Sequence, residues 1–212
     1  MQPKDSNNPI VQAARLIPEE MDSGAIEDAT RQMLAAFGED PAREGLLHTP
    51  ERVARMYQEL LAGYRTDPLA LVNDAIFKVD YDDMVIVRDI EFNSLCEHHL
   101  LPFMGHAHIA YIPHHDVIGL SKIPRIVDLF SHRLQIQERL THEIATFIME
   151  LLHPSGVAVV MEAYHLCAMI RGVRKHDARM TTSTMLGSFR TNMATRVEFL
   201  DNISRNAAPL IF

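Results

Sequence analysis

Two segments that lie far apart in the sequence place the strongest constraint on how this chain can fold. The first contains Cys96, His98 and His99 within four residues, and the second contains His165 and Cys167. The chain has 2 cysteines, and a histidine lies close to each of them. Thiolate and imidazole groups together are ligands that zinc prefers. A fold in which both segments bind one metal ion must bring them into contact.

The number of ligands decides what kind of metal site these segments can form. Cys96 and His99 have the C-x-x-H spacing that lets two side chains converge on one ion from a turn, and Cys167 adds a third ligand. A catalytic zinc site keeps three protein ligands and an open position, whereas a structural site closes with four. In an open site, His98 and His165 remain as groups that exchange protons near neutral pH. Two alternatives stay open: one of these histidines completes a structural site, or both cysteines are ordinary buried thiols.

Length and charge limit the classes of protein that the chain can represent. Its 212 residues are enough for one sizeable core, or for one core with a small appended element. The formal net charge of −8 argues against a broad nucleic-acid-binding surface, which would need a basic face. The segment Met1–Pro9 is polar, and no apolar run approaches the about 20 residues that span a bilayer. These features predict a cytoplasmic protein that binds neither nucleic acid nor membranes.

The sequence divides into three parts. Residues 1–18 are polar and contain three prolines, which predicts a flexible arm. Residues 19–76 form an N-terminal helical subdomain, with helices expected at Pro18–Phe37 and from Thr49 to Gly63. We interpret this subdomain as a packing or assembly element. Residues 77–212 form the catalytic domain.

The catalytic domain is expected to contain four strands and two long helices in the order ββααββ. Antiparallel strands with helices on one face define the α+β class. The third strand carries His165 and Cys167, which would point the same way because side chains two residues apart share a face. A long connection that includes Pro102 and Gly105 is expected between the first two strands. The expected strands are Met84–Phe92, His106–Pro113, Val157–Ile170 and Met180–Arg190, and the expected helices are Lys122–His132, Gln135–His153 and a short one at Thr195–Ile203.

Basic residues at the start of one expected helix indicate an anion site. Ser121 is a good N-cap, and Lys122 and Arg125 lie three residues apart on one face of the helix. Free N–H groups at a helix N-terminus favour an anion. Arg171 and Arg174 follow the Cys167 segment and would add positive charge. By itself this signal is weak, because basic residues at helix ends are usually just solvated.

A carboxylate near the start of the next helix has two possible roles. Gln137 and Glu138 begin this helix, where an acidic residue usually caps the helix or favours its dipole. The more specific hypothesis is a carboxylate that accepts two N–H bonds from a planar base. The sequence contains neither a P-loop nor a G-x-G-x-x-G segment, so the common nucleotide-binding motifs do not apply.

Several of these segments together resemble type I GTP cyclohydrolases, a family of zinc enzymes. The resemblance covers roughly residues 20 to 200, and the motifs occur in the family's order. It implies a tunnelling fold, in which the ββααββ units of several subunits join into a barrel, typically in a homodecamer of two stacked pentamers. The matching segments are Arg43–Ala54, Cys96–His99, Ala110–Pro113, Val117–Val127, Gln135–Thr141 and His165–Cys167.

The resemblance also implies roles for the site residues. Cys96, His99 and Cys167 would carry the zinc, which activates a water for attack on C8 of the guanine of GTP. His98 and His165 would donate and accept protons as the imidazole ring opens. Formate would leave, and ring closure would give 7,8-dihydroneopterin triphosphate, the first step of folate and pterin synthesis.

The remaining implied roles concern substrate binding. Glu138 would hold the N1 and 2-amino edge of guanine, with Gln137 beside it. No redox cofactor would be needed, and the pocket would form at subunit interfaces. The residues implied to bind the ribose and triphosphate are Ser121, Lys122, Arg125 and Arg171.

Two other functions compete with this reading. A related tunnelling-fold enzyme would act on another purine or pterin; a nitrile reductase of this kind would need a nucleophilic cysteine outside the metal site. A non-catalytic, zinc-stabilised assembly module would have a four-ligand site. Such a module would tolerate changes at Lys122, Arg125 and Glu138.

Overall fold

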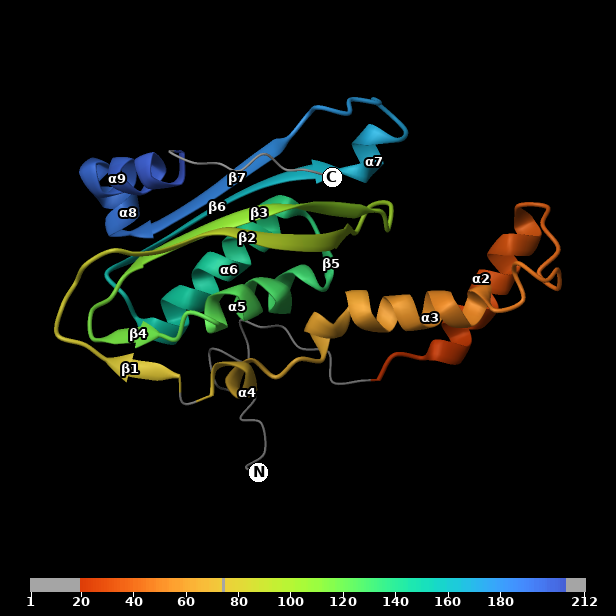
Figure 1. Cartoon of the computed structure of the whole chain (residues 1–212), viewed down its shortest axis with the longest axis horizontal. Coiled ribbons are helices and arrows are strands. Elements are labelled where there is room, and N and C mark those ends of the chain that lie inside the picture. Colours follow the sequence, from red (N-terminus) through yellow and green to blue (C-terminus); the bar gives the residue numbers. More distant parts are fainter. Residues whose placement is uncertain (1–19, 74, 205–212) are drawn as a thin grey trace.

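The structure, a computed structural model, describes residues 20–73 and 75–204. A five-stranded sheet packs against a layer of two helices, and a pair of N-terminal helices extends away from this layer (Figure 1). This arrangement confirms the expected α+β class. The expected flexible arm at residues 1–18 and the C-terminal residues 205–212 lie outside the described residues.

The large sheet has the strand order β5-β2-β3-β6-β7. Neighbouring strands are antiparallel, except that β5 pairs in parallel with the end of β2. The sequence predicted four strands; β5 was missed because two residues are too short to show a period. The strands are β2 (Val85–Cys96), β3 (Pro102–Ile112), β5 (Leu134–Gln135), β6 (Gly156–His165) and β7 (Met180–Gly187).

The connection between β2 and β3 is tight, so the expected long connection was wrong. Pro102 and Gly105 lie inside β3 instead. Pro102 occupies the first position of the strand, where a missing N–H group does least harm. Gly105 is required by close packing, because a Cβ atom there would lie 1.8 Å from the carbonyl oxygen of Glu162 on β6.

Two of the expected strands were too long. β6 ends at His165, and Cys167 lies on the short helix α7 (Leu166–Met169). The argument that His165 and Cys167 share a strand face was therefore wrong. β7 ends at Gly187, which has a φ of 55° and turns the chain into α8 (Ser188–Thr191).

The main core lies between the sheet and the two long helices, α5 (Lys122–Ser131) and α6 (Gln137–Leu152). Both helices have a continuous apolar stripe, and odd-numbered residues of β3 and β6 face it because side chains alternate along a strand. Their expected positions are confirmed to within two residues at each end. Fully buried members of this core are Phe103, Ile109, Ile126, Phe130, Ile144, Phe147, Val159 and Met161.

A smaller core covers part of the opposite sheet face. Ala110, Ala158 and Val160 occupy even-numbered positions of β3 and β6 and contact two buried phenylalanines, Phe189 and Phe199. These come from α8 and from α9 (Met193–Ser204), which corresponds to the short helix expected near Thr195–Ile203. Figure 1 shows both helices at one end of the sheet, and no other helix of the described residues packs on this face.

The N-terminal region contains the two expected helices, α2 (Ser23–Ala36) and α3 (Thr49–Leu60). Asp22 caps α2 by accepting the N–H of Ala25 at 2.9 Å. Thr49 is the first helical residue and not the cap, which is His48 without a side-chain hydrogen bond. Three short elements follow these helices: η1 (Ala62–Tyr64), α4 (Pro68–Val72) and β1 (Ile76–Lys78), which pairs with β4 (Asp116–Ile118).

One buried arginine joins the N-terminal region to the helical layer. Arg133 is 2% exposed and donates to the carbonyl oxygens of Leu129 at 2.8 Å and Gly63 at 3.0 Å. Its guanidinium group also lies over the rings of Tyr64 and Phe130. A Cβ atom on Gly63 would lie 2.2 Å from the Leu129 oxygen, so only glycine permits this approach.

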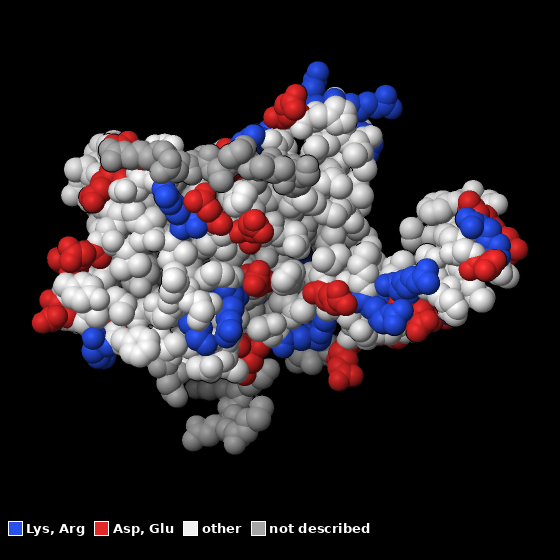
Figure 2. Space-filling model, viewed as in Figure 1, with Lys and Arg blue, Asp and Glu red and all other residues white. Residues whose placement is uncertain are grey.

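The charged side chains do not form a broad basic surface on the face shown in Figure 2. Acidic and basic residues are interspersed there, in agreement with the net charge of −8. Within residues 20–73 and 75–204, no helix combines the length and the apolar character that crossing a bilayer requires.

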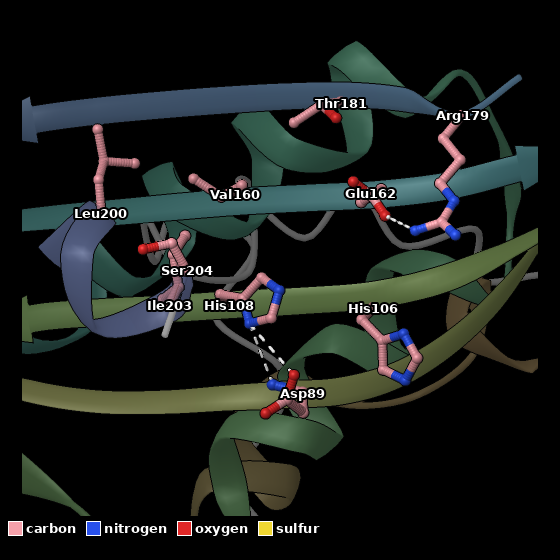
Figure 3. A pocket seen from close by; sticks show the side chains of 10 residues that line it. All are labelled: Asp89, His106, His108, Val160, Glu162, Arg179, Thr181, Leu200, Ile203 and Ser204. Atoms are coloured by element: carbon pink, nitrogen blue, oxygen red, sulfur yellow. Dashed lines mark hydrogen bonds and ion pairs between the residues drawn. The ribbon is translucent and has the colours of Figure 1, made fainter. Parts of the chain in front are cut away.

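A polar cavity of about 340 Å³ lies on the sheet face beside α9 (Figure 3). At its floor β2 contains a bulge between Val87 and Ile90, and Asp89 in this bulge has a φ of 57°. The N–H of Asp89 donates to Nδ1 of His108 at 3.1 Å. Burial lowers the pKa of His108 below its ordinary value of 6.5, although the nearby Asp89 carboxylate opposes this shift.

This burial predicts a pH-dependent contribution of His108 to stability. The unfolded state takes up a proton near pH 6.5, whereas the folded state keeps the ring neutral at that pH. Stability should therefore decrease as the pH falls below 6.5, and His108→Gln should reduce this loss. Urea unfolding at about pH 7.5 and about pH 5.5 measures the difference. Four other titratable side chains act on the ring: Asp89, Glu162, Arg88 and His106. An equal loss of stability in the His108→Gln variant would assign the effect to them.

Candidate metal centre and its surroundings

The structure brings together the three predicted metal ligands. Candidate ligand atoms of Cys96, His99 and Cys167 all lie within 4.8 Å of one another, and no other group of this kind occurs among the described residues. Cys96 ends β2, His99 lies in the turn after it, and Cys167 belongs to α7. The pairing of Phe103 with His165 aligns the ends of β3 and β6, so α7 begins beside the turn.

The turn between β2 and β3 has a geometry that directs His99 back toward Cys96. The N–H of Cys96 donates to the carbonyl oxygen of Leu101 at 2.9 Å, which closes the turn. The carbonyl oxygen of Cys96 accepts the N–H groups of His99 and Leu100. Leu100 has a φ of 54°, a left-handed conformation that a non-glycine residue adopts only when the surroundings require it.

The three residues fit a zinc ion. Zinc ligands at about 2.0–2.3 Å in tetrahedral geometry lie about 3.5 Å apart, which is compatible with the observed cluster. Cys96 is buried, Cys167 is half-buried and His99 is exposed, so one side of the group is open to a small molecule. Without an ion, burial and the adjacent Cys96 thiol raise the pKa of Cys167. Binding a cation would remove this cost, because thiolates are the ligand form.

His165 lies next to the metal group in a defined orientation. Its ring stacks on that of Phe103 with a centroid separation of 4.7 Å and an interplanar angle of 4°. Burial lowers the pKa of His165, and the Glu138 carboxylate opposes this shift. His165 ends β6 and is followed directly by α7, which carries Cys167.

Gln137 determines which nitrogen of His165 carries the proton. Its amide nitrogen lies 3.1 Å from the carbonyl oxygen of Met161 and 2.9 Å from that of Met180. Carbonyls only accept, so the amide oxygen must face Nε2 of His165, 2.8 Å away. Nε2 therefore donates, and Nδ1 of the neutral ring holds the free lone pair. Gln137 is 0% exposed, and its predicted contact with substrate stays a prediction.

The other two predicted residues near the metal group are exposed. His98 follows Cys96 in the turn, and its Nδ1 lies 3.9 Å from the Cys96 sulfur. Nη1 of Arg171 lies 2.9 Å from Nε2 of His99. Because arginine only donates, this nitrogen of His99 holds a lone pair.

The predicted phosphate-binding residues lie elsewhere in the chain. Ser121, Lys122 and Arg125 begin α5, which follows β4 at the Ile112 end of β3, whereas the metal group lies at the Phe103 end (Figure 1). Nine residues of extended strand separate the two ends by about 30 Å. Ser121 and Arg125 are exposed, and Ser121 makes no capping bond.

The side chain of Lys122, predicted to bind phosphate, is engaged within the chain. It is 7% exposed, and its Nζ donates to the carbonyl oxygen of Leu71 at 2.9 Å. One copy of the chain thus does not assemble all of the predicted site residues in one place.

Sequence reasoning did not identify three contributors to this region. Phe103 supports the His165 ring, and Thr182 lies 3.2 Å from the amide nitrogen of Gln137. The alternation of β3 places Phe103 on the same face as the core, which indicates packing but not a histidine partner. The third contributor is an ion pair between Glu97 and Arg139, whose residues both lie in motifs that had been singled out for other members.

Comparison with known proteins decides the family. A sequence model described as GTP cyclohydrolase I matches residues 26–204. The chain belongs to the GTP cyclohydrolase I family. The GTP cyclohydrolase 1 of Chlorobaculum tepidum is 55% identical over 177 residues, which cover 84% of this chain and 79% of that protein. The corresponding proteins of Leptospira biflexa and Pseudomonas aeruginosa are 56% and 55% identical and are covered over 97% and 98% of their lengths.

Membership of the GTP cyclohydrolase I family agrees with the observed architecture. The ββααββ order of the tunnelling fold is present, and the N-terminal helices precede it. The matched segment contains the whole Cys96–His99–Cys167 group, which agrees with a metal-dependent family. A structural site would require a fourth ligand; the cluster has three among the described residues, and Nδ1 of His98 lies 3.9 Å from the Cys96 sulfur.

Metal content distinguishes ligands from neighbours. We expect His99→Ala to weaken zinc binding by at least about 100-fold, since it removes a ligand. His165→Ala should retain one zinc per chain, because Gln137 and Phe103 hold this ring outside the cluster. Chelator competition measures both affinities, and exposed His142→Ala on α6 serves as the control. Loss of zinc from His165→Ala would identify a four-ligand site and remove the open position.

Proposed function

We infer that the chain catalyses the GTP cyclohydrolase I reaction. In this reaction the imidazole ring of GTP is opened by hydrolysis, formate is released, and ring closure gives 7,8-dihydroneopterin triphosphate. The observation that carries this proposal is the convergence of Cys96, His99 and Cys167 beside an oriented His165 in a member of this family. The enzyme is a hydrolase that acts on a cyclic amidine, and it needs no redox cofactor.

Zinc is the proposed ion. Cys96, His99 and Cys167 would hold it, because two thiolates and one imidazole match its preferences. When bound, zinc supplies a Lewis acid that makes hydrolytic chemistry possible at neutral pH. The same thiols favour a reducing compartment, which supports a cytoplasmic location.

The chain's own residues would orient the purine and move protons. Glu138 is exposed and accepts the N1 and 2-amino groups of guanine, while its charge acts on His165. The lone pair on Nδ1 of His165 is the free proton acceptor, since Nε2 donates to Gln137. His98 is exposed beside Cys96 and serves as a second proton donor or acceptor. Gln137 supports the guanine site mainly by holding His165.

A second copy of the chain would complete the pocket. Ser121, Lys122 and Arg125 are proposed to bind the ribose and triphosphate together with Arg171, but α5 begins at the opposite sheet end from the metal group. Copies that meet edge to edge would place one α5 start beside another copy's metal group. Among residues 20–73 and 75–204 of one copy, no strand pairs with the outer edge of β7, and closing a barrel removes such edges. We propose a homodecamer of two pentamers, in which α2 and α3 contribute exposed apolar side chains.

Product formation tests the reaction directly. Purified protein incubated with GTP should release formate and form a pterin chromophore in equal amounts. Removal of the metal with a chelator should abolish both products, and zinc should restore them, because the cluster has no other means of activating water. If a zinc-loaded, assembled protein formed neither product, the site would be structural or specific for another purine.

Co-expression tests whether two copies share each pocket. Glu138→Ala and Arg125→Ala should each abolish most turnover while leaving zinc binding and assembly intact. Mixed oligomers of the two variants should recover about a quarter of the wild-type rate, because random assembly leaves that share of pockets with both residues. Oligomers in which every chain carries both substitutions are the control. Absence of recovery in verified mixed oligomers would place both residues in one chain's pocket.

A further inference from the structure

A set of contacts that the proposed roles do not use joins the metal-binding turn to the start of α6. The Arg139 guanidinium donates from Nη2 to a carboxylate oxygen of Glu97, the residue directly after Cys96. The same nitrogen donates to the carbonyl oxygen of Leu134 at 3.0 Å, and Nε donates to the side-chain oxygen of Gln135 at 2.9 Å. Arg139 thus bridges the turn and the junction between β5 and α6.

Gln135 holds this bridge from the protein interior. Its side chain is 1% exposed, and the amide nitrogen donates to the carbonyl oxygen of Phe130 at 3.1 Å and to the Glu143 carboxylate at 2.8 Å. Both of these groups accept, so the amide oxygen must face Arg139. The backbone carbonyl of Gln135 also accepts the N–H of Glu97 at 3.0 Å. The arginine therefore has a rigid support on both sides.

These contacts join the residue after a metal ligand to the residue after the proposed guanine-binding carboxylate. Glu138 lies one residue before Arg139, and Cys96 lies one residue before Glu97. We propose that Glu97 and Arg139 are positioning residues that set the separation between the metal group and the guanine-binding carboxylate. This inference rests on the proposed role of Glu138. Misplacement of a reacting group by about 1 Å can reduce a rate by about 100-fold.

The pair acts through its neighbours and not by contact with the metal group. It lines an open cavity of about 330 Å³ together with Tyr64 and Glu143, and none of the three metal-group residues lines that cavity. The side chains of Arg139 and Glu97 are 33% and 34% exposed, and ion pairs this exposed contribute little to folding stability. Loss of the pair should therefore alter catalysis much more than it alters the melting temperature.

A double-mutant cycle separates positioning from stability. Glu97→Gln and Arg139→Gln should each lower kcat by about 10- to 100-fold and leave KM for GTP within about threefold. Zinc affinity should fall by about tenfold, because residues that support ligands tune a metal site. The double variant should be no worse than Arg139→Gln alone, since both changes remove one interaction.

The chain offers a matched control on the other sheet face. Arg179 donates to Glu162 at 2.8 Å, and these side chains are 42% and 37% exposed. Arg179→Gln removes a comparable ion pair and should change neither kcat nor zinc affinity. Thermal melting and sedimentation of every variant establish that folding and assembly are retained. Glu97→Gln changes only an exposed side chain, so it decides the question if Arg139→Gln does not fold.

Several outcomes would overturn the proposal. These are wild-type kcat and zinc affinity in folded Arg139→Gln or Glu97→Gln, additive effects in the double variant, or equal losses in Arg179→Gln. Zinc affinity and the absorption spectrum of the Co²⁺-substituted protein are measured without GTP. These two measurements therefore test the Glu97–Arg139 ion pair independently of the role of Glu138. If Glu138 does not bind guanine, the variants should change zinc affinity and leave kcat unchanged.

Discussion

The short parallel pairing between β2 and β5 is the contact on which the candidate site depends. Leu95 pairs with Leu134 and Cys96 with Gln135, so the strand that ends in a metal ligand lies beside the residues that begin α6. Parallel neighbours need a long crossover, and here α5 and the preceding β3 hairpin provide it. A pairing of only two residues is weak by itself. Further bonds hold the same two segments together: Ser94 on β2 donates to the carbonyl oxygen of Arg133, and the N–H of Glu97 donates to that of Gln135.

Because side chains alternate along a strand, the two faces of the sheet carry different residues and pack against different elements. Odd-numbered residues of β3 and β6 are apolar and bury against α5 and α6, which makes the sheet end at Phe103 and His165 rigid. Even-numbered residues change along the strands from apolar Ala110 to polar His108 and His106. Phe199 of α9 packs on the apolar part, and Leu200 and Ile203 of α9 border the polar part. The polar side chains of His106 and His108 line the cavity on this face, and no residue of the metal group lines it.

The sequence was sufficient to predict features that depend on local pattern or on ligand chemistry. The two core helices have a clear apolar period, and the C-x-x-H spacing with a distant Cys167 predicted the cluster that the structure contains. The end of β6 was less predictable, because Tyr164–Ile170 is apolar enough for a strand, whereas residues 166–169 form a helix in the structure. β5, with two residues, and the tight turn with its left-handed Leu100 depend on tertiary contacts that leave no periodic signal.

Three consecutive residues at the start of α6 point in different directions, because a helix turns by about 100° per residue. Gln137 points into the interior and fixes the orientation of His165. Glu138 is exposed toward the proposed guanine site, and Arg139 reaches sideways to the metal-binding turn. Three consecutive side chains thus contact His165, present an exposed carboxylate and bind the turn that carries Cys96 and His99. Because one helix end carries all three, a shift of α6 relative to β2 would disturb them together. The pairing of Gln135 with Cys96 and its backbone bond from Glu97 oppose such a shift.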